Sequence, residues 1–537
     1  MARDMRYTLK NSEPMGKTSR LIAALLCCWG LAAPRAMATD YVDDINNGQH
    51  ADGQHVVYEM NVGAFTAEGT LAAAQARLKE LKRIGADIVW LMPIYPRGGG
   101  INSPYAATDF QQANPAYGTI DDLKAFVGAA HALGMQVWLD WVPNHTATDA
   151  RWVGEHPEYY KRSGGSFVHP NNYADVYQLD YGNGELRKAM TDCMKFWIDR
   201  ADIDGYRCDY ISSREIPVSY WQEAIPEIKG CKAGKAITFL GEADIAADAT
   251  RLKAAGFDYD YAWQFQSQLA NFGNGTAAAR PRAFANTLMA HQADIGFGRM
   301  LYITNHDQNY NEKKKTLTQK YGDNRYPLTV LYFTVWGMPL VYNGQETGGN
   351  QALNYFTDEK IDWAQTDSKM LNTIRTLSAL KHSVAAFRDG KAAADNHSVS
   401  WLTVNNNTSV LAYSCKHGDS EAVVVLNFGT SATAATVSGL TAGEYGLWLD
   451  SETIARGTGR KAVSLGATHT FELQAKGYRV YVKGHFADEG TAAMGAITTG
   501  AASGGPVYSL GGQRRGSSGQ LPGGIYISNG RKYVKRH

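Results

Sequence analysis

Residues 119–145 read TIDDLKAFVGAAHALGMQVWLDWVPNH, and this stretch holds a complete helix-to-strand unit. Its first part places apolar residues at helical spacing and reaches Gly134, a normal end for a helix. Its second part, QVWLDWV, is a short run of Val, Leu and Trp, which is typical of a strand buried on both faces. A helix that leads into a buried strand is the repeating unit of a parallel α/β protein.

The same unit repeats along much of the chain. Amphipathic stretches such as TLAAAQARLKELKRIG, residues 70–85, separate short apolar runs that predict strands. Eight such strands alternating with helices favour a closed (β/α)8 TIM barrel, and a doubly wound sheet is the alternative that the pattern leaves open. The eight runs, in chain order, are HVVYEM, ADIVWLMP, QVWLDWV, IDGYRC, AITFLG, FDYDYAW, MLYITN and MPLVYNG.

The remaining segments predict further domains. The barrel should occupy residues 39–390, with an irregular insertion at about 146–184 that is long enough to be functional. Residues 391–483 show strands separated by Asn, Gly, Asp and Ser turns, which predicts an all-β sandwich. Residues 484–505 form a Gly/Ala-rich, flexible linker, and residues 506–537 look like two short strands around a Gly-rich loop. Linker and tail resemble sorting or attachment modules of exported bacterial proteins; a dispensable basic end is the alternative.

Composition excludes several classes of partner. The 537 residues are 44% hydrophobic and 20% charged, as expected of a soluble globular chain with a large core. The formal net charge is +1, so no global field favours nucleic acid or an acidic membrane. The 12 Trp and 30 Tyr suit stacking on sugar rings, although a large core also uses them. The oligomeric state stays open.

The first 38 residues predict a secretory signal peptide. Lys17 and Arg20 precede LIAALLCCWGLAA, and AMA at 36–38 is a plausible cleavage site. A membrane anchor is the alternative, but the apolar stretch is short for a stable span. We therefore expect an exported protein in the periplasm, at the cell surface or outside the cell. Four dispersed cysteines would remain, mostly as buried thiols, and neither CxxC nor His-rich spacing points to zinc.

Three acidic residues follow predicted barrel strands. Asp209 comes after the fourth strand, Glu242 after the fifth and Asp307 after the seventh. The carboxyl ends of barrel strands meet at one face, where active sites are built. Each acid taken singly fits an exposed loop equally well. Acids that converge repel one another, so the set points to chemistry or to a cation.

Arg207 gives two of these acids different predicted roles. Residues i and i+2 of a strand face the same side, so Arg207 should lie beside Asp209. The neighbouring cation should lower the pKa of Asp209 and keep this carboxylate ionised, as a nucleophile requires. Nearby carboxylates should raise the pKa of Glu242, which suits a general acid. One ionised and one protonated carboxyl are the machinery of a retaining glycosidase.

These motifs resemble a known family. DWVPNH, DGYRCD, LGE and TNHDQN match, in order and spacing, the four signature regions of the α-amylase family, glycoside hydrolase family thirteen. The resemblance covers roughly residues 56–483. It implies Asp209 as nucleophile, Glu242 as acid/base and Asp307 as the residue that grips sugar hydroxyls. It also implies four substrate-binding residues, Tyr105 beneath the sugar ring and His145, Arg207 and His306 around it.

One departure from the family concerns calcium. Many starch-cleaving members carry Lys-His shortly after the nucleophile, where this chain has Ser212 and Ser213. The change removes a contact to the sugar beyond the scissile bond and weakens the usual calcium arrangement, which uses a carbonyl there. Asn144 matches another calcium-ligand position, although Asn after a strand is often a turn residue. Bound calcium stays open, and no organic cofactor is expected.

The expected function is secreted, retaining hydrolysis of α-1,4-glucosidic bonds in starch, glycogen or maltodextrins. A transglycosylase, an oligosaccharide α-glucosidase or a debranching enzyme on the same scaffold is the first alternative, because the catalytic acids are shared. A non-catalytic glucan-binding protein is the second. The intact set of Asp209, Glu242 and Asp307 argues against that second alternative.

Overall fold

The computed structural model describes most of the chain from Tyr41 onward. The described residues are 41–50, 53–243, 246–273, 281–283, 285, 298–310, 314–388, 397–452, 462–484 and four strands between 507 and 535. The predicted signal peptide at 1–38 lies outside them, as does the predicted linker apart from residue 484.

Eight parallel strands close into a barrel, in the order β1-β12-β11-β10-β9-β8-β3-β2. The barrel closes because β1 pairs with β12 on one side and with β2 on the other. The predicted TIM barrel is confirmed, and the doubly wound alternative is excluded. The strands are β1 (Val57–Met60), β2 (Ile88–Leu91), β3 (Gln136–Trp141), β8 (Gly205–Cys208), β9 (Thr238–Gly241), β10 (Tyr259–Tyr261), β11 (Gly298–Leu301) and β12 (Met338–Tyr342).

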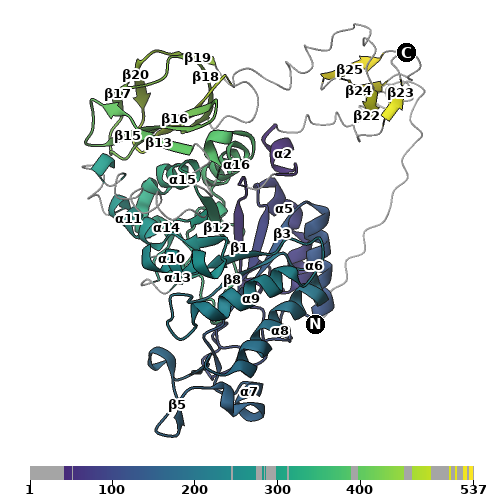
Figure 1. Cartoon of the computed structure of the whole chain (residues 1–537). Coiled ribbons are helices and arrows are strands. Elements are labelled where there is room, and N and C mark those ends of the chain that lie inside the picture. Colours follow the sequence, from purple (N-terminus) through teal and green to yellow (C-terminus); the bar gives the residue numbers. More distant parts are fainter. Residues whose placement is uncertain are drawn as a thin grey trace, which may run out of the picture. The chain divides into compact units, whose positions relative to one another are not determined.

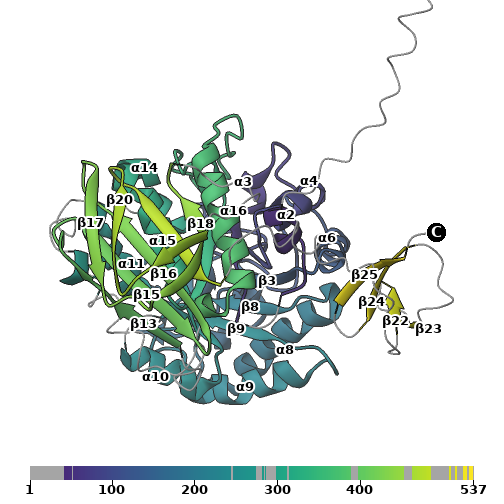
Figure 2. The same ribbon diagram turned by 90° about the horizontal axis from the view of Figure 1, so that it is seen from above.

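Helices surround the barrel. Figures 1 and 2 show α6, α8 and α9 following one another outside the strands. Thr119 starts α6 with a capping box shared with Asp122. The amphipathic stretch 70–85 forms two helices, α4 and α5, that meet at Arg77. The principal helices are α4 (Leu71–Ala76), α5 (Leu78–Arg83), α6 (Ile120–Ala132), α8 (Gly184–Ala201), α9 (Val218–Gly230), α10 (Ala246–Ala255), α11 (Trp263–Gly273), α15 (Arg325–Thr334) and α16 (Ser368–Ser383).

Large side chains fill the barrel interior. Trp90, Trp138, Tyr259 and Met300 are buried there in one apolar cluster. A second and larger apolar layer packs the outer faces of the strands against the helices. The barrel is therefore a packed core rather than a channel, and polar groups at the ends of its strands have a rigid support.

The insertion after β3 consists of short elements. Its strands β4 (His145–Ala147) and β7 (Val176–Gln178) pair antiparallel and fix its base. Between them lie α7 (Arg151–Glu155), β5 (Arg162–Ser163) and β6 (Ser166–Phe167), and Figure 1 shows α7 and β5 extending away from the barrel. Five shorter helices also matter below: α2 (Tyr41–Asn46), α3 (Val62–Phe65), α13 (His306–Tyr310), α14 (Leu317–Tyr321) and η6 (Gln345–Thr347).

Two antiparallel sheets follow the barrel, as predicted. One has the order β13-β15-β16-β21-β18-β19 and the other β14-β17-β20. The runs SVSWLTVNN, SVLAYSCK, AVVVLNF, EYGLWLD and GYRVYVK predict strands in this region. Strands β17, β19 and β20 are additional, because their partly exposed sequences TAATVS, AVSL and THTFEL give only a weak apolar signal. Their bounds are β13 (His397–Trp401), β14 (Thr403–Val404), β15 (Val410–His417), β16 (Ser420–Asn427), β17 (Thr433–Ser438), β18 (Gly443–Asp450), β19 (Ala462–Leu465), β20 (Thr468–Leu473) and β21 (Tyr478–Lys483).

The C-terminal tail forms a four-stranded antiparallel sheet, where the sequence predicted two strands. Its order is β23-β22-β24-β25. In the sequence Asn529-Gly530 separates β24 from β25, a pair typical of hairpin loops. The strands are β22 (Val507–Ser509), β23 (Arg514–Gly516), β24 (Gly524–Ser528) and β25 (Arg531–Lys535). Among the described helices of the whole chain, none has both the length and the hydropathy needed to cross a membrane.

Candidate active site

Arg207 organises a group of acids at the carboxyl ends of the barrel strands. It lies on β8 beside Asp140 of β3, and its side chain is fully buried. Its Nη1 donates to Asp140 Oδ1 at 2.8 Å and to Asp209 Oδ1 at 2.9 Å. Its Nε donates to the Tyr261 hydroxyl at 3.1 Å. The guanidinium thus fixes the orientation of Asp209 from below.

Glu242 lies directly beside Asp209. Arg207 Nη2 is 3.0 Å from Glu242 Oε1, and the backbone N–H of Tyr210 donates to Glu242 Oε2 at 2.8 Å. Asp209 and Glu242 thus contact the same guanidinium. Two carboxyls that share one guanidinium suit a retaining glycosidase, whose catalytic pair lies roughly 5–5.5 Å apart.

Tyr210 shows how the backbone is bent to reach Glu242. Its φ of 49° is left-handed, a conformation that costs a non-glycine residue energy and is kept where the surroundings require it. This turn aims the Tyr210 N–H at the Glu242 carboxyl. The ring of Tyr210 remains 37% exposed, although most large apolar side chains nearby are buried.

Asp307 reaches the same group from α13. It follows His306, whose Nε2 lies 3.6 Å from Asp307 Oδ2. His306 Nδ1 contacts Glu59 Oε1 at 2.5 Å, and His306 Nε2 contacts the Tyr105 hydroxyl at 2.7 Å. Tyr105 in turn donates to Asp140 Oδ2 at 3.1 Å. A continuous polar chain therefore joins Asp307 to the Arg207 cluster.

Burial and charge shift the pKa of both central carboxyls upward. Burial raises the pKa of Glu242 to about 7; Arg207 opposes this rise, and Asp209 and Asp307 add to it. Burial also raises the pKa of Asp209, although Arg207 lowers it. The expectation that Arg207 would leave Asp209 with a lowered pKa was wrong, because desolvation and the nearby Asp140 carboxylate outweigh the guanidinium. A pKa of about 7 suits Glu242 to hold a proton near neutral pH.

The two predicted histidines carry different charges. Burial lowers the pKa of His306, but Asp307 and Glu59 raise it to about 9, so this imidazole is protonated at neutral pH. Burial lowers the pKa of His145 to about 4 and leaves it neutral. Its Nδ1 lies 3.1 Å from Asn144 Nδ2.

The structure brings the predicted site residues together. Asp209 and Glu242 both contact Arg207, while Asp307 and His306 join them through Tyr105. The Tyr105 ring stacks on His306, with centroids 5.3 Å apart. Side-chain exposure is 14% for Asp209 and Glu242 and 30% for Asp307, so solvent reaches all three acids.

The site contains residues that sequence reasoning missed. Glu59 lies under His306, and Tyr261 receives a hydrogen bond from Arg207. A lone acid within the apolar run HVVYEM was the available signal for Glu59, since a buried carboxylate needs a partner. Trp141, Trp152 and Tyr159 are buried in the main core.

Asn144, the predicted calcium ligand, is surrounded by hydrogen-bond donors. Gln178 Nε2 donates to Asn144 O at 2.7 Å and to Asn144 Oδ1 at 3.1 Å. Ser213 Oγ donates to Asn144 Oδ1 at 2.8 Å, and the Ser213 carbonyl accepts from Arg251 at 3.2 Å. These oxygens face an amide nitrogen and a guanidinium where calcium would need free oxygen ligands. The residues present do not fit a calcium ion at this position.

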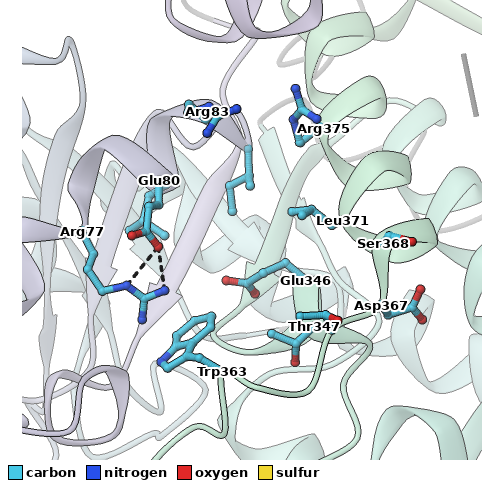
Figure 3. Close-up of a pocket in the computed structure, with 13 residues that line it drawn as sticks. Arg77, Glu80, Arg83, Glu346, Thr347, Trp363, Asp367, Ser368, Leu371 and Arg375 are labelled. Carbon is cyan, nitrogen blue, oxygen red and sulfur yellow. Dashed lines mark hydrogen bonds and ion pairs between the residues drawn. The ribbon is translucent and has the colours of Figure 1, made fainter. Parts of the chain in front are cut away.

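A pocket elsewhere in the molecule contains none of the predicted site residues. Figure 3 shows it between α5, η6 and α16, with a volume of about 340 Å³. Arg77 hydrogen-bonds to Glu80 there and covers the Trp363 ring at 3.8 Å. Glu346 accepts a hydrogen bond from Tyr58 at 2.7 Å. Its main groups are engaged with one another, so we assign the chemistry to the acids at the strand ends.

A TIM barrel with adjacent carboxyls at its strand ends, held by a buried arginine, is the architecture of a glycoside hydrolase. A sequence model of the α-amylase catalytic domain matches residues 41–178 and 159–424. The chain belongs to the α-amylase family, whose enzymes act on α-glucans. The predicted family resemblance is confirmed.

Individual relatives have several activities. The α-amylase MalA of Haloarcula japonica is 26% identical over 438 residues, 78% of this chain and 61% of that protein. An α-1,4-glucan:maltose-1-phosphate maltosyltransferase of Streptomyces coelicolor is 25% identical over 429 residues, 72% of this chain and 59% of that protein. This chain thus spans 59–61% of the length of these relatives. The structure of the maltogenic α-amylase AmyB from Thermotoga neapolitana has a TM-score of 0.68 and 25% identity over 80% of this chain and 98% of that one.

Proposed function

We propose that the protein hydrolyses α-1,4-glucosidic bonds of starch, glycogen or maltodextrins with retention of configuration. The placement of Asp209 and Glu242 on one buried guanidinium carries this proposal. The two carboxyls share one arginine, yet Glu242 holds its proton to a pKa of about 7. A nucleophile and a proton donor beside one another are what double displacement requires.

In the first step Asp209 attacks the anomeric carbon while the glycosidic C–O bond breaks. The Glu242 proton passes to the departing oxygen, which leaves as the hydroxyl of the shortened glucan. Arg207 remains hydrogen-bonded to Asp209 and holds the attacking oxygen in place. The product of this step is an ester between Asp209 and the sugar.

In the second step Glu242, now ionised, takes a proton from a water molecule that attacks the anomeric carbon. The ester bond to Asp209 breaks, and both carboxyls return to their starting states. Asp307 and the protonated His306 lie at the edge of this group, where they bind hydroxyls of the reacting sugar. Acid/base assistance of this kind contributes roughly 10²–10⁴-fold to the rate.

Transfer to a second sugar is the alternative outcome of the same intermediate. The maltosyltransferase relative belongs to the same family. In this chain the Ser213 hydroxyl is bonded to Asn144, so it is not available to an acceptor sugar next to the nucleophile. We therefore favour water as the acceptor.

The test is a time course with maltoheptaose labelled at its reducing end, with products separated by chromatography. Hydrolysis gives labelled fragments shorter than the substrate, and an early α-anomer detected by NMR establishes retention. Asp209→Asn is the matched control and should be inactive while its melting temperature stays near that of the wild type. Products longer than the substrate would show that the enzyme transfers sugars instead of hydrolysing bonds. Turnover by the Asp209→Asn variant would refute the assignment of Asp209 as nucleophile.

We also propose export through the N-terminal signal peptide, to the periplasm, the cell surface or the medium. We further propose that calcium is not needed at Asn144, because Gln178 already supplies a donor to both oxygens of that residue. Fractionation of cells with antibodies to the C-terminal tail tests the first proposal. Melting curves with and without added calcium test the second.

A further inference from the structure

A second polar cluster lies at the opposite end of the barrel strands. Asp87 immediately precedes β2, His50 follows α2, and His382 lies in the last turn of α16. His50 Nδ1 is 2.6 Å from Asp87 Oδ1, and His382 Nε2 is 2.8 Å from Asp87 Oδ2. The side chains are 7%, 4% and 0% exposed for His50, Asp87 and His382. Two imidazoles therefore converge on one buried carboxylate.

The outer nitrogens of both imidazoles face hydrogen-bond acceptors. His50 Nε2 lies 2.9 Å from the Ile45 carbonyl, which can only accept, so this nitrogen carries a proton. His382 Nδ1 lies 3.1 Å from Asn46 Oδ1. The amide orientation of Asn46 is fixed because its Nδ2 donates to two backbone carbonyls at 3.2 and 3.0 Å. His382 Nδ1 therefore carries a proton as well.

These partners leave the inner nitrogens facing Asp87. In a neutral imidazole the inner nitrogen presents a lone pair, which would be directed at a carboxylate oxygen. Protonating both rings would remove that conflict but would stack two imidazolium ions with centroids 3.4 Å apart. The Lys82 ammonium, 3.3 Å from Asp87 Oδ1, faces the same carboxylate.

We propose that His50, Asp87 and His382 bind a divalent transition metal, with zinc as the best match. The candidate ligand atoms all lie within 4.8 Å of one another. Two imidazole nitrogens and a carboxylate suit zinc, and outer N–H groups that donate to carbonyl oxygens are usual for metal-bound histidines. With Zn–N bonds of about 2.0–2.1 Å, neighbouring ligand atoms lie roughly 3.3 Å apart. Each imidazole nitrogen, now 2.6 or 2.8 Å from its carboxylate oxygen, therefore needs to move away from that oxygen by about 0.5–0.7 Å.

The metal has a route into the cluster. His50 and Asp87 line an open pocket of about 540 Å³, which also provides room for a water molecule as fourth ligand. His131 lines the same pocket but is bonded to Asp204 at 2.8 Å and does not belong to the cluster. His131 thus offers a matched control for metal binding at the pocket surface.

The position of the cluster indicates a structural role. It joins segments separated by 37 and 295 residues in the sequence, His50 to Asp87 and Asp87 to His382. Asp87 sits at the amino end of β2, away from the acids that follow the strands, and this end of a TIM barrel serves stability. The bound metal therefore ties α2 and α16 to the barrel and takes no part in the reaction. These large separations explain why no metal motif is visible in the sequence.

The experiment uses the whole chain with a purification tag that contains no histidine. After chelator treatment and dialysis, Zn²⁺ is titrated by calorimetry and the metal content of the loaded protein is measured by elemental analysis. We expect one zinc per chain and a rise in melting temperature of about 5 °C at saturating zinc. Bound Co²⁺ should show visible absorption bands without a thiolate-to-metal band.

Three variants decide whether the cluster is the binding site. His50→Gln and His382→Gln should each lose zinc binding and the gain in melting temperature, whereas His131→Gln should keep both. His50→Gln is the decisive variant if the fully buried His382 cannot be replaced without unfolding. The proposal is overturned if the wild type shows no saturable zinc binding, or if binding persists in His50→Gln.

Discussion

Replacing Glu242 by Gln tests the central chemical assignment. Gln keeps the size of the side chain and an oxygen to accept from the Tyr210 N–H, but it has no proton to deliver. Acid/base assistance is worth roughly 10²–10⁴-fold, so kcat on maltoheptaose should fall by that factor, or about 2.7–5.4 kcal/mol of activation free energy. An α-maltosyl fluoride loses fluoride without protonation, so its glycosylation step should fall by less than about tenfold.

The pH dependence sharpens the same test. With a Glu242 pKa of about 7, about one tenth of the molecules are protonated one unit above that value, and the wild-type rate should fall accordingly. In Glu242→Gln this alkaline limb should disappear. Glu346→Gln is the matched control, because Glu346 is also buried but contacts Tyr58 and no site residue. Equal losses on both substrates, or an alkaline limb that persists in Glu242→Gln, would refute the reasoning.

The remaining predictions concern pH, Arg207 and Gln178. The apparent pKa of the acid limb of wild-type kcat/KM should lie above the ordinary pKa of an aspartate, because burial raises the pKa of Asp209. A pH–rate profile of kcat/KM measures this value. Arg207→Lys should lower kcat at least 10²-fold and destabilise the fold by about 3–5 kcal/mol, because one ammonium cannot replace every guanidinium contact; urea unfolding measures the loss. Gln178→Glu should lower the melting temperature without calcium and recover it with calcium, because carboxylate oxygens would then face both oxygens of Asn144; the wild type should show no response.

The sequence predicted the barrel because its strands are buried on both faces and carry unbroken apolar runs. Asp209 and Glu242 follow such runs directly and Asp307 follows one after His306, so their positions past the strand ends could be predicted without knowing any contact. The direction of the pKa shift of Asp209 could not be predicted from the sequence. The i and i+2 spacing shows that Arg207 lies beside Asp209, but it does not show how deeply the carboxyl is buried, and burial raises its pKa. Strands β17 and β20 escaped prediction for a related reason, since their exposed faces replace apolar residues with Thr.

Contacts between distant segments set the limit of sequence reasoning in this protein. Gln178 and Asn144 are 34 residues apart, and nothing in either segment shows that the amide of one points at the oxygens of the other. The same holds for Glu59 beneath His306 and, at the other end of the barrel, for His382 against Asp87. In each case a polar group is buried only because a partner from another strand or helix satisfies it. The family motifs predict which side chains lie at the site. The long-range partners determine the charge of those side chains, as Glu59 does for His306, and they determine whether the oxygens of Asn144 are available to a cation.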